Sequence, residues 1–405
     1  MIGPGGFSVA TKGDFGEGSN RRRAGVWRLL LSGALLLSFL AGPAVAARSR
    51  PKSPPAKSDA EAAWITINAD TGDVLSSQDP DRLGAPASMT KMMLALLIME
   101  AVRDGQVTLA EPVRTSALAS KMGGSQVFLK SGEAFPVQEM MAALLIGSAN
   151  DAAAVLAERL GGSIPGAVSR MNDRAAELGL SRTRFASVHG LPPGAGQEGD
   201  VSTPRDMARL SQELVKFPEI LRWTSTAEAP FRQGAFILEN SNQLIGRFPG
   251  ADGLKTGHFR EAGFNLAATA VRGGLRLITV VMGAASNRAR VAEAARLLEE
   301  GFRRYVEVTV AKAGQPAGTA IHLPRANGAF RPVPTGDLRV FVKREEREAV
   351  RTTVEVQSGL RAPVTQGQPV GHLVARIGDR EVARVPLVAG ASVRRAFFWW
   401  LTPWR

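Results

Sequence analysis

Residues 85–93, APASMTKMM, place a serine and a lysine three positions apart at the start of a long apolar run. Residues three apart on a helix share one face, so Ser88 and Lys91 are neighbours if this run is helical. A lysine held among apolar groups loses hydration, which favours its neutral form. A neutral amine can take the proton of a serine hydroxyl, as in serine–lysine nucleophiles. The helix N-terminus would add backbone N–H groups for an oxyanion.

By itself, the Ser-x-x-Lys pattern is a weak signal. The same pattern occurs at residues 49–52, in a Pro-rich stretch where it carries no function. The alternative interpretation is that Ser88 caps a helix and that the Lys91 ammonium group extends past its apolar stem into water. This motif alone favours that alternative, so two further motifs decide between the interpretations.

The second motif, S-A-N, occupies residues 148–150 in a short break between two apolar runs. Its polar side chains would otherwise lack a purpose in this break. The structural alternative is an N-cap, in which Ser148 or Asn150 caps a helix that starts at Ala152. Both interpretations can hold, because a cap and a functional site can share residues.

The third motif, K-T-G, occupies residues 255–257, just before the apolar segment FNLAATAV. It is rarer by chance than the other two motifs, and it occurs once. Gly257 would let a ligand approach the edge of a strand closely. The structural alternative is a turn that leads into a hairpin.

In this order, the three motifs are those of the penicilloyl-serine transferases. Their spacing resembles that of low-molecular-mass penicillin-binding proteins. The segments ASMTKMM, SANDAAAVLAE, SVHGLP, TPRDMA, DGLKTGH and AGFNLAATA resemble the serine D-alanyl-D-alanine carboxypeptidases of peptidase family S11. The resemblance runs from about Trp64 to the end of the chain. It implies a β-lactamase/transpeptidase-like catalytic domain and removal of the terminal D-alanine from peptidoglycan pentapeptide stems.

The resemblance also implies a catalytic role for each matching residue. Ser88 would attack the carbonyl between the two D-alanines of the stem, and Lys91 would be the base for acylation. Ser148 would relay a proton to the leaving amine, and Asn150 would hydrogen-bond the substrate amide. Lys255 would supply positive charge beside Ser148.

Substrate binding is assigned by the same resemblance to the K-T-G segment and the residue after it. Thr256 would hold the terminal carboxylate, and the backbone N–H groups of Ser88 and His258 would form the oxyanion hole. The expected neighbours of Lys91 are then Asn150 and Lys255, and two lysines near one serine depress each other's pKa. The substrate-binding set is Lys255, Thr256, Gly257 and His258.

Three other functions are compatible with the same motifs. A D,D-endopeptidase would cut cross-links instead of terminal D-alanine, and the motifs do not separate the two reactions. A β-lactamase would need a carboxylate base for rapid deacylation. Neither Glu177, in a helix-like stretch, nor Glu198, in a Gly-rich loop, is placed for that role. A catalytically inactive wall-binding scaffold is disfavoured because all three motifs are intact. His189 is interpreted as structural.

Helices and hairpins must position these residues, and the apolar spacing predicts where they lie. Residues 88–102 are apolar nearly all round, which predicts a buried helix. Arg272-Gly273-Gly274, between two apolar runs, predicts a hairpin. An α+β domain ending near Tyr305 follows. The other predicted elements are two strands around the turn at 70–72, helices over 137–146 and 152–160, a helix opened by Thr203-Pro204, and a last helix with the inner face Val291, Ala295, Leu298 and Phe302.

Beyond residue 305 no helical pattern remains. LRVFVKR, RTTVEVQ, GHLVARI and REVARVPLV are short alternating segments that predict a small all-β domain. The expected organisation is a signal peptide at 1–46, a Pro/Ser/Lys linker at 47–60, the serine D,D-peptidase catalytic domain at 61–305, the all-β domain at 306–390 and an amphipathic segment at 391–405.

The two ends of the chain predict export and membrane attachment. Arginines precede the apolar stretch 29–40, and Ala44 and Ala46 fit a signal cleaved after Ala46, the alternative being a retained anchor. About 12 apolar residues are too few to span a bilayer. Segment 391–405 predicts an interfacial helix on the outer leaflet of the cytoplasmic membrane. Its alternatives are a cover for the β domain and a dimer contact. Its apolar face comprises Phe397, Trp400, Leu401 and Trp404, and its flanking arginines are Arg394, Arg395 and Arg405.

Composition narrows the function further. The 405 residues carry a formal net charge of +13, but the excess is not in one patch and aromatic residues are few. This disfavours nucleic acid and suits an anionic membrane or polymer. The chain has no cysteine, which excludes disulfides and thiol catalysis. Its four histidines show no metal spacing, so we expect no metal and no cofactor. The expected partners are the stem peptide, β-lactams and the membrane of a periplasmic enzyme.

Overall fold

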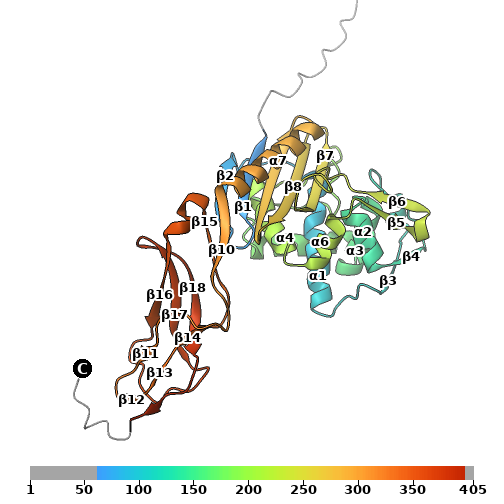
Figure 1. Ribbon diagram of the computed structural model, residues 1–405. Coiled ribbons are helices and arrows are strands. Elements are labelled where there is room, and N and C mark those ends of the chain that lie inside the picture. Colours follow the sequence, from blue (N-terminus) through green and yellow to red (C-terminus); the bar gives the residue numbers. More distant parts are fainter. Residues whose placement is uncertain (1–61, 397–405) are drawn as a thin grey trace, which may run out of the picture. The chain divides into compact units, whose positions relative to one another are not determined.

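The computed structural model describes residues 62–396 (Figure 1). A five-stranded antiparallel sheet, ordered β2-β1-β9-β8-β7, forms the centre of the catalytic part. Gly273 and Gly274 join β8 to β9 with positive φ angles, so the predicted hairpin is confirmed. The strands of this sheet are β1 (Ala63–Asn68), β2 (Val74–Gln78), β7 (Ala251–Phe259), β8 (Gly263–Arg272) and β9 (Leu275–Ala284).

Helix α7 (Asn287–Arg304) packs on one face of this sheet, and α1 and α5 belong to the core on the other face (Figure 1). Successive side chains of a strand point to opposite faces. Leu277 and Val281 of β9 therefore join the core beneath α7, whereas Ile278 and Val280 join the core that contains α1. The other helices are α1 (Lys91–Arg103), α2 (Val137–Leu145), α3 (Asn150–Gly161), α4 (Ile164–Glu177), α5 (Pro204–Leu214) and α6 (Pro218–Thr224).

The predicted helices are confirmed, with differences at their first turns. The helix expected over 88–102 begins as the 3-10 turn η1 (Ala87–Thr90) and continues as α1, most of which is buried. Helix α3 begins at Asn150 and ends before Gly162, whose φ of 70° is left-handed. Thr203 caps α5 as predicted, because its Oγ1 accepts the N–H of Asp206.

Several elements have weaker sequence signals: of α4 only a helix-like stretch around Glu177 was indicated, and the others were not predicted. Helix α4 buries Ala167, Met171 and Ala175, two of which are too small to give a clear apolar period. Strand β7 contains K-T-G in its interior, so the hairpin-turn interpretation of this motif is wrong. The other unpredicted elements are α6 and the pairs β3 (Pro112–Arg114) with β4 (Ala134–Pro136) and β5 (Glu228–Phe231) with β6 (Phe236–Glu239).

Beyond α7 the described residues form strands and one 3-10 turn, η4 (Arg344–Ala349), so the predicted α+β part followed by a β domain is confirmed. Val340, Leu373 and Leu387 lie in its core. One sheet has the order β14-β18-β17-β16, and β10 pairs with β15. These strands are β10 (Tyr305–Ala311), β14 (Pro332–Pro334), β15 (Leu338–Lys343), β16 (Val350–Val356), β17 (Pro369–Ile377) and β18 (Arg380–Ala389).

Short pairings complete the β domain. Strand β11 (Ile321–His322) pairs with β13 (Ala329–Phe330), and β12 (Ala326–Asn327) pairs with β19 (Arg394–Arg395). The predicted signal peptide, the whole of the predicted linker and the aromatic face of segment 391–405 lie outside the described residues. Within 62–396, no helix has both the length and the apolar character needed to cross a bilayer.

Candidate active site

Ser88 and Lys91 lie at the junction of η1 and α1. The Lys91 Nζ donates hydrogen bonds to the Ser88 Oγ, 3.1 Å away, and to the carbonyl oxygen of His189, 2.7 Å away. Ser88 is half-buried, whereas Lys91 has no exposed surface. Ala87 has a positive φ of 50°, a strained conformation for a residue with a Cβ. The amine is thus within reach of the hydroxyl proton and shielded from water.

The electrostatic surroundings of Lys91 favour a neutral amine. Burial is the main cause that holds the pKa of Lys91 well below its usual value, and the positive charge of Lys255 lowers it further. The carboxylates of Asp200 and Asp151 act in the opposite direction. The expectation that Lys255 depresses the pKa of Lys91 is therefore confirmed, although burial has the larger effect.

A loop that carries His189 contacts η1. Gly190 has a φ of 77°, and a Cβ there would lie 2.0 Å from the carbonyl oxygen of Ala87, so only glycine allows this approach. Burial lowers the pKa of His189 to about 4, and its Nδ1 accepts the N–H of Leu191. This contact of the imidazole with the backbone of its own loop is compatible with the predicted structural role of His189. The sequence did not indicate that the carbonyl of the same residue would contact Lys91.

The S-A-N motif connects α2 to α3. Ser148 has a positive φ of 58°, and Asn150 is the first residue of α3. The Asn150 Nδ2 donates to the carbonyl oxygen of Gly123, and its backbone N–H donates to that of Ser125, both at 2.7 Å. The residue at the N-cap is Ala149, and neither polar side chain of the motif caps the helix, so the capping interpretation is wrong.

The other side-chain atom of Asn150 is an unused acceptor. Its Oδ1 is buried and has no hydrogen-bond partner among the described residues. Buried polar atoms in folded proteins are almost always paired, so an unpaired carbonyl oxygen is an acceptor available to a ligand N–H. This matches the predicted contact with a substrate amide.

The K-T-G motif lies on β7, the edge strand next to η1. A Cβ at Gly257 would lie 2.3 Å from the carbonyl oxygen of Pro86, so the absence of a side chain lets β7 approach the turn that carries Ser88. The Lys255 Nζ is buried and donates to the carbonyl oxygen of Thr256 at 3.2 Å. His258 is exposed and stacks on Phe264 with the ring centroids 3.9 Å apart.

Arg290 on α7 belongs to this site, although no sequence motif contains it. Its Nη1 donates to the carbonyl oxygens of Gly257 and Asn265, at 3.1 and 2.9 Å, and so holds β7 against β8. Burial, and then the charge of Arg290, lower the pKa of Lys255 to about 7. We expected Lys91 to lower the pKa of Lys255, but the causes of the shift are burial and Arg290. Only the packing of α7 on the sheet reveals this arginine.

Ser241 is a second residue near the site that sequence reasoning missed. Its hydroxyl forms a short hydrogen bond with the Thr256 hydroxyl. The asparagines on either side fix its backbone: the Nδ2 of Asn240 donates to the carbonyl of Thr224, and that of Asn242 donates to the carbonyl of Gly253. Thr256 therefore has a fixed polar partner beside the expected carboxylate position.

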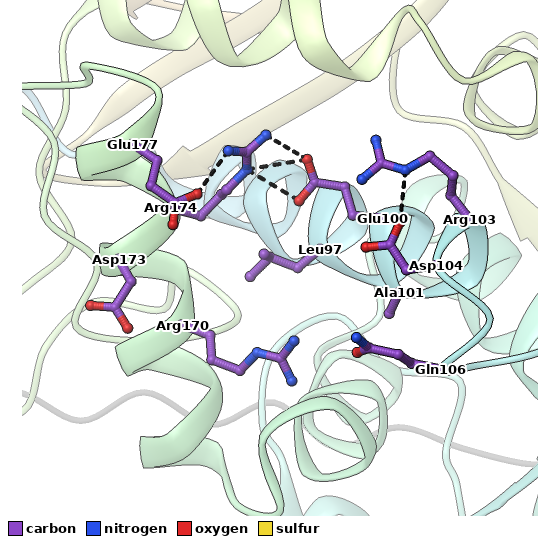
Figure 2. Close-up of a pocket in the computed structure, with 10 residues that line it drawn as sticks. All are labelled: Leu97, Glu100, Ala101, Arg103, Asp104, Gln106, Arg170, Asp173, Arg174 and Glu177. Atoms are coloured by element: carbon purple, nitrogen blue, oxygen red, sulfur yellow. Dashed lines mark hydrogen bonds and ion pairs between the residues drawn. The ribbon is translucent and has the colours of Figure 1, made fainter.

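A pocket of about 390 Å³ lies elsewhere, between the end of α1 and α4 (Figure 2). It contains no residue of the three motifs. Figure 2 shows Arg174 between Glu100 and Glu177, with which it forms ion pairs at 2.7 and 2.8 Å. Glu198 pairs with Arg184. Glu177 and Glu198, the two candidates for the carboxylate base of a β-lactamase, therefore both form ion pairs with arginines.

The residues that the structure brings together at this site are serine, lysine and amide side chains. No group of three His, Cys, Asp or Glu side chains in residues 62–396 is arranged to hold a metal ion. The structure brings together Ser88, Lys91 and the strand that carries Lys255, and it places the amide of Asn150 at the start of a neighbouring helix. The arrangement suits acyl transfer to a serine activated by a neutral lysine.

Comparisons with known proteins cover most of the chain. A family model described as D-alanyl-D-alanine carboxypeptidase matches residues 48–286, and one described as penicillin-binding protein 5, C-terminal domain, matches residues 306–395. The D-alanyl-D-alanine carboxypeptidase DacF of Bacillus subtilis is 36% identical over 374 residues, which are 91% of this chain and 94% of the relative. DacC of Escherichia coli is 31% identical over 388 residues, 92% of this chain and 93% of the relative.

Solved structures give the same relationship. Penicillin binding protein 5 from Haemophilus influenzae has a TM-score of 0.68 at 26% identity and covers 85% of this chain and 99% of its own. Penicillin-Binding Protein D2 from Listeria monocytogenes, in an ampicillin-bound form, has a TM-score of 0.55 at 33% identity. That match covers 60% of this chain and 97% of the other.

Proposed function

Because the chain belongs to the D-alanyl-D-alanine carboxypeptidase family, we propose that it removes the terminal D-alanine from peptidoglycan pentapeptide stems through an acyl-enzyme on Ser88. One observation carries this assignment of the nucleophile. The Lys91 amine lies 3.1 Å from the Ser88 hydroxyl, and burial holds its pKa well below the usual value, so it is placed to act as the base that takes the serine proton.

In acylation, the Ser88 Oγ attacks the carbonyl carbon between the two D-alanines, and its proton passes to the Lys91 amine. The backbone N–H groups of Ser88 and His258 hold the oxyanion. The C–N bond then breaks, and the amine of the departing D-alanine receives a proton through Ser148. The shortened stem remains as an ester on Ser88, with its amide N–H held by the free Oδ1 of Asn150.

In deacylation, a water molecule attacks the ester carbonyl. The ester C–O bond breaks, Ser88 regains a proton, and the stem leaves with a new carboxylate.

Before cleavage, the terminal carboxylate of the substrate is bound by the Thr256 hydroxyl and the positive charge of Lys255. β-Lactams acylate the same serine in this proposal, and the ampicillin-bound relative supports it.

Two alternatives use the same residues. A D,D-endopeptidase would cleave cross-linked stems through the same acyl-enzyme. Rapid hydrolysis of penicillin is disfavoured because Glu177 and Glu198 are both paired with arginines. An inactive wall-binding scaffold is disfavoured because the activated Ser88–Lys91 pair is present.

The experiment that tests the proposed function uses one pentapeptide stem, one cross-linked dimer and one labelled penicillin. We expect mass spectrometry to show the loss of one alanine residue from the pentapeptide and a stable penicillin adduct on Ser88. The Ser88→Ala variant should give neither product while unfolding at a temperature within a few degrees of the parent. An adduct on another serine, or no adduct on the folded enzyme, would refute the assignment.

For location, we infer an exported, periplasmic enzyme attached peripherally to the outer leaflet of the cytoplasmic membrane. The arginine-flanked apolar stretch at 29–40 supports export, and the aromatic residues of 397–405 support attachment. Residues 391–396 still hydrogen-bond to the β domain, for instance from the Ala396 N–H to the Arg325 carbonyl at 2.9 Å. The proposed anchor is therefore the shorter segment 397–405.

A further inference from the structure

A buried carboxylate outside the three motifs lies against the start of α1. Asp200 is only 7% exposed, and its oxygens accept hydrogen bonds from two backbone and two side-chain donors. Its Oδ1 accepts the N–H groups of Ala186, at 2.6 Å, and Ser187, at 2.8 Å. Its Oδ2 accepts the hydroxyls of Thr90, at 3.0 Å, and Ser187, at 2.7 Å.

These bonds connect the two elements that determine where the Lys91 amine lies. Thr90 directly precedes Lys91 in the chain, so its bond to Asp200 fixes the start of the helix. Ser187 lies two residues before His189, whose carbonyl oxygen accepts the Lys91 Nζ at 2.7 Å. Asp200 is therefore a second polar link between the loop and the start of the helix, besides the bond from Lys91 to the His189 carbonyl.

Asp200 does not act on the substrate directly. Each of its oxygens already accepts two hydrogen bonds, which uses the acceptor positions that a carboxylate oxygen offers. No position remains to take a proton from an attacking water. Any effect on the reaction must therefore pass through Lys91.

The charge of Asp200 is also close enough to matter. The charged groups that act on Lys91 are Lys255 from β7, Asp151 from α3 and Asp200 from the loop. Lys255 lowers the pKa of the amine, and the two carboxylates raise it. His189 adds no charge near neutral pH, because its pKa is about 4.

We propose that Asp200 is a positioning residue for acylation: it holds the His189 carbonyl against the Lys91 amine and keeps a negative charge beside that amine. The inference rests on the proposed role of Lys91 as the base. It assigns a function to a residue that lies in none of the three motifs.

The test measures the pH dependence of the second-order rate at which a fluorescent penicillin acylates the full-length enzyme. In Asp200→Asn, the amide oxygen can still accept both backbone N–H groups and its NH2 can donate to the two hydroxyls, so chiefly the charge is lost. Loss of a nearby negative charge favours the neutral amine, so the acid limb of the profile should move to lower pH.

A second variant tests the anchoring. Asp200→Ala leaves the N–H groups of Ala186 and Ser187 without their acceptor and removes the bond to Thr90, and we expect acylation to slow by about 10- to 100-fold. Asp206→Asn is the matched control. Asp206 is 3% exposed and accepts the Arg182 N–H, at 2.9 Å, and the Thr183 hydroxyl, at 2.8 Å, but has no bond to α1. Its acid limb should stay where it is.

The outcomes separate this inference from the proposed function. An acid limb that is absent or unmoved in Asp200→Asn would overturn the inference. An equal shift in Asp206→Asn would do the same, because it would show a general effect on the fold. A parent enzyme that folds but does not take the label would instead refute the role of Ser88. If Asp200→Ala does not fold, the nearly isosteric Asn variant still decides the question.

Discussion

At the scale of single residues, the site contains two buried lysines with different surroundings. The Lys91 Nζ donates to the Ser88 hydroxyl and to the His189 carbonyl. The Lys255 Nζ donates to the carbonyl of the next residue, and the charge of Arg290 acts on it. Burial lowers the pKa of both. The first is placed to take a proton, and the second is placed to present charge on the edge strand.

This difference predicts opposite responses to the same substitution. Lys91→Arg should lose nearly all acylation, by at least about 100-fold, because a guanidinium group cannot be deprotonated in a protein. Lys255→Arg should keep a measurable fraction, since the charge remains. Penicillin-labelling rates of both variants check this. Equal rates in the two variants would contradict the division of roles.

The pKa of Lys255 predicts the basic side of the pH profile. Because this pKa is lowered to about 7, the side chain is charged below that pH and becomes neutral as pH rises through it. Binding of the substrate carboxylate should therefore weaken above about pH 7, which is seen as a rise in KM. In Lys255→Arg the charge persists, so the rise should move to much higher pH. If KM rises at the same pH in the parent and in Lys255→Arg, the rise reports the titration of a group other than Lys255.

At the scale of elements, the site depends on how closely three pieces of backbone approach one another. The turn η1 is flanked by the loop that contains Gly190 and by strand β7 at Gly257. A Cβ at Gly190 would collide with the carbonyl oxygen of Ala87, and a Cβ at Gly257 would collide with that of Pro86. Glycine is required there by the distance between backbones.

A pair of glycine variants isolates this contact. Gly190→Ala should destabilise the fold by more than the roughly 1 kcal/mol that a positive φ costs alanine, because the new Cβ would collide with the Ala87 carbonyl. Gly162→Ala is the control, since its φ is 70° and nothing lies within 4 Å of the Cβ position. Urea unfolding and penicillin labelling measure the two effects. If Gly190→Ala is as stable and is labelled as fast as Gly162→Ala, the loop can move away from Ala87 at little cost, and the close contact is not required.

At the scale of the whole molecule, a catalytic α+β part is followed by a β domain and then by a short aromatic segment. The formal net charge of +13 suits a surface of anionic lipid or anionic polymer. The β domain extends to Ala396, because β19 pairs with β12. This boundary decides where the chain can be cut without loss of folded structure.

Removal of residues 397–405 should release the mature protein into the soluble periplasmic fraction. The three tryptophans at the end of the chain supply the apolar area for an interfacial anchor, and none of the residues assigned to the active site is in the deleted segment. Activity on a soluble peptide should stay within about twofold of the parent, because the deletion removes no residue assigned to catalysis or substrate binding. A truncated protein that still sediments with membranes would place the attachment elsewhere, for example in an uncleaved N-terminal segment.

The sequence by itself determined the chemical identity of the site and much of the architecture. Short-range spacing places Ser88 and Lys91 on one turn, and the apolar pattern predicts α1 and α7. The Thr203-Pro204 cap predicts α5, and the Gly273-Gly274 turn predicts the β8–β9 hairpin. These features depend on residues that are close together along the chain, so local pattern is enough to find them.

Only the tertiary structure decided what surrounds the lysines. Arg290, Ser241, Asp200 and the His189 carbonyl lie 98 or more positions from Lys91 along the chain, in segments with no catalytic motif. They reach the site because helices and loops pack on one sheet edge. Burial, which lowers the pKa of both lysines, is likewise a property of the assembled core. Local spacing can identify a nucleophile and its base, but desolvation and long-range hydrogen bonds exist only once the chain has folded.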